Sequence, residues 1–171
     1  RFTGEPSVFH RGLYAKIAEF GVKFEGKSVV DIGCGTGVHT LFLAQICREI
    51  TGMDISGEML KVMVEDAVKF NISNLTDVQS DFKNFKPNRV YDVAFSTMSP
   101  AIADEEDFVK FINLGEKRVY LWWNKPRYSS VLELFYEGSH RGCFKEKANF
   151  FEEYLRRENI AFNSCVLEES R

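Results

Sequence analysis

The residues whose spacing points most clearly to chemistry form a glycine-rich stretch at positions 31–37, DIGCGTG. The β-branched pair Val29-Val30 precedes it and the apolar run 41–44 follows it, which predicts a buried strand, a turn and a helix. Glycines at such a turn leave backbone N–H groups accessible and let a ligand approach the main chain, because they carry no Cβ. The stretch therefore predicts a ligand site at the end of the first strand.

The spacing of the glycines narrows the choice of ligand. A dinucleotide fingerprint has the pattern G-x-G-x-x-G, whereas here Gly37 follows Gly35 by two residues. A phosphate-binding loop of the G-x-x-x-x-G-K-[ST] type is absent. Asp31, two residues before Gly33, would repel a pyrophosphate and would suit a ligand that carries an ammonium and a sulfonium. A glycine-rich turn that binds nothing is the alternative.

Two further carboxylates follow later predicted strands. Asp54 lies about 20 residues after Gly33, where an acid binds the ribose hydroxyls in doubly wound folds, although the same spacing would serve NAD. Asp81 follows the next strand, and a carboxylate beside the backbone N–H of Phe82 would complement the edge of an adenine ring. The alternatives are a helix cap for Asp54 and a turn residue for Asp81.

The elements that must position these residues alternate between strands and helices, which indicates an α/β three-layer sandwich. The first helix is predicted over residues 6–20. Strands are predicted over 29–32, 49–56, 75–79, 89–96, 117–123 and 160–168, and further helices over 36–48, 57–70, 104–113, 128–137 and 145–158.

The stretch at 31–37 resembles the first motif of the class I S-adenosylmethionine-dependent methyltransferases, D/E-x-G-x-G-x-G. Asp54, Asp81 and the segment YDVAFSTMSPAI at 91–102 are similar to three later motifs of that family, in the same order. The resemblance covers residues 28–123 and implies a Rossmann-like, mostly parallel sheet of the seven-stranded type, in the order 3-2-1-4-5-(7)-6. No seventh strand is recognisable, so we expect the fold to lack the last strand or to be truncated there.

The resemblance implies S-adenosylmethionine as the methyl donor, S-adenosylhomocysteine as the product, and no metal. The expected cofactor contacts are Asp31, Gly33, Cys34, Gly35, Gly37, Asp54, Ile55, Asp81, Phe82 and Ser96. His39 would lie in the first turn of the helix after the glycines, either at the surface or near the methionine end of the cofactor. No catalytic residue is assigned; if the reaction needs a base, the candidates are His10, Tyr14 and His140.

The methyl acceptor is less well indicated by the sequence. Relatives that methylate nucleobase or amide nitrogens carry Asn/Asp-Pro-Pro-Tyr/Phe in the fourth motif, where this chain reads STMSP at 96–100. We therefore predict in-line transfer of a methyl group to a small molecule. The alternatives are an RNA methyltransferase, a degenerate cofactor-binding domain without activity and, less well supported by the glycine spacing, an NAD-dependent oxidoreductase. A basic stripe near the site would favour RNA; its candidates are Lys83, Lys86, Arg89, Lys125 and Arg127.

Composition and charge place the chain among globular proteins. Its 171 residues, 44% of them apolar and 27% charged, suffice for one domain over residues 1–171, with a helical segment over the cofactor at 1–27 and the core at 28–171. A net charge of −3 argues weakly against a nucleic-acid partner. No stretch is apolar enough for a membrane span or a signal peptide, and the four cysteines are scattered. We expect a cytoplasmic protein with free thiols and no membrane partner; the sequence does not indicate an oligomeric state.

Overall fold

The computed structural model describes residues 1–122 and 146–167 of the chain. The chain divides into two compact units, the first running from Arg1 to Tyr120 and the second from Leu121 to Glu168. The single domain expected over residues 1–171 stays a prediction. None of the described helices is long and apolar enough to cross a membrane.

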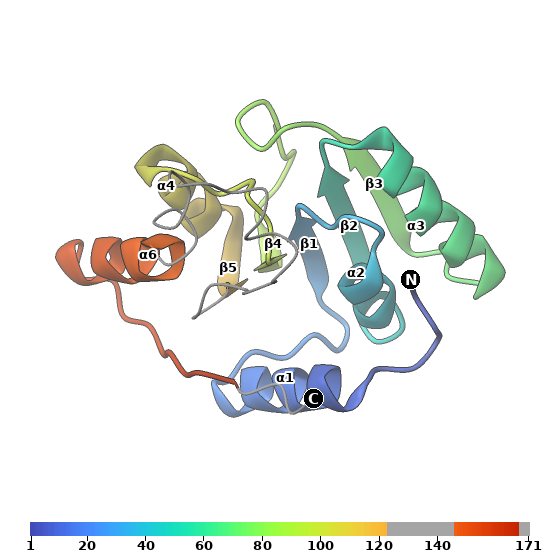
Figure 1. Ribbon diagram of the computed structural model, residues 1–171, viewed down its shortest axis with the longest axis horizontal. Helices are drawn as coiled ribbons and strands as arrows, with labels where there is room; N and C mark the ends of the chain where they lie inside the picture. The colour runs from blue at the N-terminus through green and yellow to red at the C-terminus, as the bar shows by residue number, and fades with distance from the viewer. Residues whose placement is uncertain (123–145, 168–171) are drawn as a thin grey trace, which may run out of the picture. The chain divides into compact units, whose positions relative to one another are not determined.

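A five-stranded sheet in the order β3-β2-β1-β4-β5 forms the centre of the first unit (Figure 1). Its strands are β1 (Ser28–Ile32), β2 (Glu49–Asp54), β3 (Leu75–Gln79), β4 (Tyr91–Thr97) and β5 (Gly115–Leu121). β1 pairs in parallel with β2 and with β4, and β2 pairs in parallel with β3. This is the order that the family resemblance implies for the first five strands.

Helices cover the sheet on both faces. They are α1 (Val8–Glu19), α2 (Val38–Ala44), α3 (Gly57–Lys69) and α4 (Glu105–Leu114). α2 and α3 contact each other and pack on β2, whereas α4 packs on β4. Right-handed crossovers that lead away from β1 in opposite directions place their helices on opposite faces. The predicted α/β sandwich with a Rossmann-like sheet is confirmed, with five strands.

The ends of the helices follow from local sequence. α3 begins after Ser56, whose hydroxyl accepts a hydrogen bond from the N–H of Met59 at 3.3 Å, so Asp54 is not needed as its cap. α2 is shorter than the helix predicted over 36–48. It begins after Gly37, whose φ is +77°, and its end at Ala44 leads through a tight turn into β2.

The second unit contains α6 (Glu146–Arg157). The strand predicted over 160–168 is wrong, because residues 160–167 form no strand and most of their side chains are exposed. Alternation without a buried face does not hold a strand in a sheet. The helix predicted over 128–137 and the candidate residues Lys125, Arg127 and His140 lie outside the described residues.

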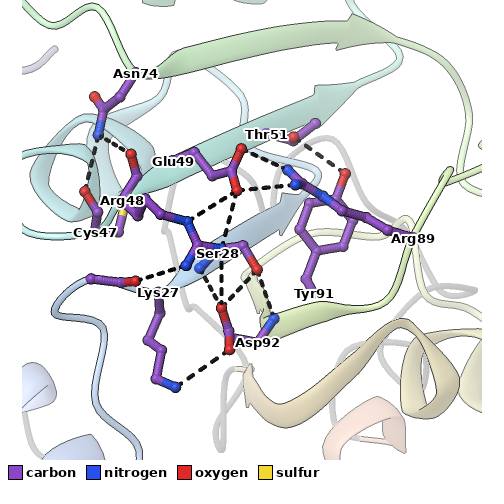
Figure 2. A network of polar contacts seen from close by, with 11 residues as sticks. Lys27, Ser28, Cys47, Arg48, Glu49, Thr51, Asn74, Arg89, Tyr91 and Asp92 are labelled. Atoms are coloured by element: carbon purple, nitrogen blue, oxygen red, sulfur yellow. Dashed lines mark hydrogen bonds and ion pairs between the residues drawn. The ribbon is translucent and has the colours of Figure 1, made fainter.

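Hydrogen bonds and ion pairs tie together the amino ends of β1, β2 and β4 (Figure 2). Asp92 Oδ2 accepts hydrogen bonds from the backbone N–H of Ser28 at 2.7 Å and from the Ser28 hydroxyl at 2.8 Å. Asp92 Oδ1 lies 3.3 Å from Lys27 Nζ. These bonds, those from Ser28 foremost, lower the pKa of Asp92 to about 2. Glu49 pairs in turn with Arg89 at 2.9 Å, so this edge of the sheet is closed by paired charges.

Replacing Asp92 tests this network. Asp92→Ala leaves the N–H of Ser28, a residue only 4% exposed, without its acceptor. We expect the free energy of unfolding to fall by about 1–3 kcal/mol in urea denaturation at pH 7. The difference from wild type should shrink as the pH falls from about 4 through 2, because the contribution of the ionised carboxylate, whose pKa is lowered, is lost on protonation.

The matched control is Lys27→Ala, which removes the exposed partner of the same carboxylate. Its cost should stay below about 1 kcal/mol. Equal costs for the two substitutions would show that Asp92 acts only as a surface charge.

Candidate functional site

The loop between β1 and α2, residues 33–37, lies at the carboxyl end of the central strand. Gly33, Gly35 and Gly37 have φ values of +70°, +56° and +77°, in the region that favours glycine. The N–H groups of Gly33 and Cys34 both donate to the carbonyl of Met53, at 2.7 and 3.0 Å. The loop is thereby fixed to the end of β2.

The three glycines have different surroundings. A Cβ on Gly33 would lie 1.7 Å from Ser99 Oγ, and a Cβ on Gly37 would lie 2.2 Å from Met63 Cγ. A Cβ on Gly35 would meet nothing closer than Met59 Sδ at 3.6 Å, an ordinary contact. Gly33 and Gly37 therefore allow other parts of the chain to pack closely, whereas the backbone of Gly35 borders open space.

Asp54, at the end of β2, is buried beside this loop. Its Oδ2 accepts a hydrogen bond from the N–H of Gly35 at 2.8 Å, and its Oδ1 accepts one from the N–H of Ser56 at 2.9 Å. A carboxylate oxygen has two acceptor sites, so both oxygens can still bind hydroxyl donors. Ile55, the next residue, is 69% exposed and presents an apolar side chain at the same edge.

Asp31, at the carboxyl end of β1, is only 1% exposed. Its Oδ2 accepts a hydrogen bond from the Thr40 hydroxyl at 2.6 Å, and its Oδ1 has no hydrogen-bond partner among the described residues. Burial raises its pKa to about 7, opposed by the bond from Thr40 and reinforced by the charge of Asp54. A buried carboxylate oxygen without a donor is costly, so the arrangement suits a cationic group of a ligand.

The remaining predicted contacts have side chains that the fold already uses. Asp81 accepts hydrogen bonds from the backbone and side-chain nitrogens of Asn84, at 2.9 and 2.7 Å, and so closes the turn after β3. The ring of Phe82 is buried. Ser96 is fully buried and donates its hydroxyl to the carbonyl of Ile32 at 3.0 Å. The cofactor roles of Asp81, Phe82 and Ser96 stay predictions. The predicted role of Phe82 is a contact through its backbone N–H.

Two residues near the loop have contacts that the sequence did not reveal. The hydroxyl of Thr40 donates a hydrogen bond to Asp31. The sequence indicates this contact only by a polar residue three positions after Gly37. His39 is half-buried rather than at the surface, and its Nδ1 lies 3.0 Å from the hydroxyl of Tyr14 on α1. The structure thus brings Tyr14, a candidate base, together with His39.

Known proteins similar to this chain include several methyltransferases. A family model described as a methyltransferase domain matches residues 29–114, more than half of the chain. Pavine N-methyltransferase of Thalictrum flavum subsp. glaucum is 30% identical over 94 residues, which are 54% of this chain and 26% of that protein. An uncharacterized RNA methyltransferase of Chlorobaculum tepidum is 34% identical over 73 residues, 43% of this chain and 15% of that protein. The chain spans less than half the length of these relatives.

Solved structures share the fold. An S-adenosylmethionine-dependent methyltransferase from Aquifex aeolicus aligns with a TM-score of 0.56 at 20% identity, over 68% of this chain and 67% of that one. One from Clostridium acetobutylicum aligns with a TM-score of 0.54 at 21% identity, over 63% of this chain and 46% of that one. The strand order, the glycine loop and the matched family model together show that the chain belongs to the class I S-adenosylmethionine-dependent methyltransferase family.

Proposed function

We propose that this chain binds S-adenosylmethionine and transfers its methyl group to a small-molecule acceptor. The observation that carries the proposal is the buried carboxylate of Asp31, whose Oδ1 has no hydrogen-bond partner in the described chain, near the open backbone of Gly35. An α-amino group would supply the missing donors and the compensating charge.

The other residues of this edge fit the rest of such a ligand. Asp54 has acceptor sites left for two ribose hydroxyls, and exposed Ile55 offers an apolar surface to an adenine ring. The turn at Asp81 and Phe82 would meet the adenine edge. The bound sulfonium supplies an already electrophilic methyl group, so the protein has mainly to align the acceptor and exclude water.

Two observations favour a small acceptor over RNA. Of the candidate residues for a basic stripe, Lys83 pairs with Asp104 at 2.7 Å and Arg89 pairs with Glu49 at 2.9 Å, which reduces the positive potential available to phosphates. Pavine N-methyltransferase, similar to this chain over about half of it, is named for a small-molecule acceptor. RNA remains the second candidate because RNA methyltransferases also match.

Calorimetric titration with S-adenosylmethionine, S-adenosylhomocysteine and NAD, in parallel, tests the ligand. Micromolar binding of the two sulfur ligands and none of NAD is the expected result. Binding of NAD alone would overturn the assignment of the glycine loop. Binding of none would favour a degenerate domain.

Gly35→Ala tests the open backbone. The added Cβ would occupy the space assigned to the ligand, and we expect the calorimetric affinity for S-adenosylhomocysteine to fall by about tenfold or more. The control is Gly26→Ala, since Gly26 has a similar φ of +68° and nothing within 4 Å of its Cβ position. Both variants should lose about 1–2 kcal/mol of stability from backbone strain. Unchanged affinity in Gly35→Ala would place the ligand elsewhere.

Asp31→Asn tests the carboxylate through the pH. A cationic ligand binds the ionised form of Asp31. Because the pKa of Asp31 is about 7, this carboxyl group is mostly protonated below pH 7 and must lose its proton when the ligand binds. Wild-type affinity for S-adenosylhomocysteine should therefore fall by up to about tenfold per unit as the pH drops from 7 to 5, a range in which the α-amino group stays protonated. Asp31→Asn should bind more weakly at pH 8, with no such slope. The same slope in the variant would assign the proton to another group.

Asp54→Ala tests the ribose site. The substitution removes the expected acceptor of the ribose hydroxyls and the partner of the Gly35 N–H. We expect calorimetric affinity for S-adenosylmethionine to fall by about 1.5–3 kcal/mol. Asp77→Ala, which removes an exposed acid on neighbouring β3, is the control. Unchanged affinity in a folded Asp54→Ala variant would remove Asp54 from the site.

A further inference from the structure

Tyr14 and His39 form a hydrogen-bonded pair against the carboxyl edge of the sheet. Tyr14 Oη lies 3.0 Å from His39 Nδ1, and both residues are half-buried. The ring of His39 lies 5.5 Å from that of Phe95 on β4, and Phe95 pairs in register with Asp31 on β1. The residue after His39 is Thr40, which donates to Asp31. Three elements thus place this pair beside the carboxylate assigned to the cofactor.

The pair is uncharged near neutral pH. Burial, and then the charge of His10 on α1, lower the pKa of His39 to about 4. Burial, and then the charge of Asp31, raise the pKa of Tyr14 above its usual value. The titratable rings that pack against His39 are those of His10 and Tyr14 from α1, and Phe95 on β4 contributes an uncharged ring. The charge of Asp31 on β1 acts on Tyr14. Neither an imidazolium nor a phenolate is favoured here.

The hydroxyl of Tyr14 can accept a further hydrogen bond. A hydroxyl has one proton to donate and two lone pairs, and a neutral imidazole has one nitrogen that accepts. Asp31 Oδ1 receives no hydrogen bond from the described residues, so the Tyr14 proton is not donated to it. We assign His39 Nδ1 as the acceptor of that proton, which requires the His39 tautomer protonated on Nε2. An oxygen lone pair of Tyr14 is then left for a donor on a bound molecule.

The charges that act on this edge are negative. Asp31 raises the pKa of Tyr14, and Asp31 and Asp54 both add to the burial that raises the pKa of Cys34. No lysine or arginine of the described chain contributes to either shift. A site with this potential disfavours a carboxylate or phosphate acceptor and accommodates an amine.

We propose that Tyr14, oriented by His39, accepts a hydrogen bond from the N–H of an amine acceptor and directs the nitrogen lone pair at the methyl group. This inference rests on the proposed methyl transfer. The acceptor reacts as its neutral amine, formed when the ammonium loses a proton to water before transfer. The lone pair of this neutral amine forms the N–C bond, and the C–S bond breaks with its electron pair going to sulfur, which becomes uncharged. The product nitrogen carries the positive charge and loses its proton to water after release. No group of the protein has to take a proton, in agreement with the weak basicity of His39.

Calorimetry on the complex with S-adenosylhomocysteine at pH 8.5 tests the acceptor class. The probes are phenethylamine and tetrahydroisoquinoline, with phenylacetate and phenyl phosphate as anions of similar size. We expect both amines to bind and neither anion to do so. Tyr14→Phe should weaken amine binding by about tenfold, the loss of one hydrogen bond. Tyr91→Phe, which removes a hydroxyl bonded to Thr51 at the opposite edge, should have no effect.

The outcomes separate this inference from the proposed function. Loss of S-adenosylhomocysteine binding by the wild-type chain overturns the proposed function. If the wild-type chain binds S-adenosylhomocysteine, three results would overturn the role of Tyr14. These are binding of the anions as well as the amines, binding of neither amine, and unchanged amine affinity in Tyr14→Phe. His39→Asn, which keeps an acceptor near the position of Nδ1, should retain more amine affinity than His39→Leu; equal losses would reduce His39 to a packing residue.

Nitrogen-15 NMR of the histidine rings gives a readout independent of any acceptor. We expect His39 to carry its proton on Nε2 and to stay uncharged from pH 5.5 to pH 9, because its pKa is about 4. Tyr14→Phe should shift the Nδ1 resonance by removing its donor. A proton on Nδ1, or an imidazolium at pH 7, would overturn the assigned direction of the hydrogen bond.

Discussion

The buried carboxylate of Asp31 is the constraint on which the carboxyl edge of the sheet depends. The structure supplies one donor, the hydroxyl of Thr40, and leaves the second oxygen without a partner among the described residues. Because burial raises its pKa to about 7, the neutral acid stabilises the fold at low pH, and this contribution is lost as the pH rises through 7. Ionised Asp31 thus destabilises the unliganded chain, and a bound cation would restore the loss.

At the opposite edge of the same sheet, the carboxylate of Asp92 contributes to stability and has a full set of hydrogen-bond and ion-pair partners. Asp92 is the second residue of β4 and Asp31 the last but one of β1, yet the pKa of Asp92 is lowered to about 2 while that of Asp31 is raised to about 7. Asp92 has backbone, hydroxyl and ammonium donors, and Asp31 has one hydroxyl. The pKa values of these two aspartates differ because hydrogen-bond and ion-pair partners surround Asp92 at the amino edge, whereas Asp31 at the carboxyl edge has only one donor among the described residues.

The positions of the candidate site residues on the carboxyl edge of the sheet could be predicted from sequence, because local spacing determines them. A strand, an acid and alternate glycines position Asp31 and the loop, and Asp54 follows from the length of one helical crossover. What could not be predicted depends on contacts between distant segments. Gly33 is required by Ser99 and Gly37 by Met63, and the bond of Tyr14 with His39 joins two helices. The wrong strand at 160–168 has the same cause, since alternation does not identify a partner strand.

The charge balance of the reaction links the acceptor to Asp31. When a neutral amine attacks a sulfonium, one positive charge moves from sulfur to nitrogen and none is created or neutralised. A site whose nearby charges are Asp31 and Asp54 can therefore stabilise the complex before and after transfer with the same groups. An anionic acceptor would have to lose its water beside these carboxylates, and no lysine or arginine among residues 1–122 and 146–167 alters the pKa of Tyr14 or Cys34. The negative charges that suit the proposed cofactor thus also favour an amine acceptor. In the proposal, the uncharged Tyr14–His39 pair orients that amine without adding charge to the site.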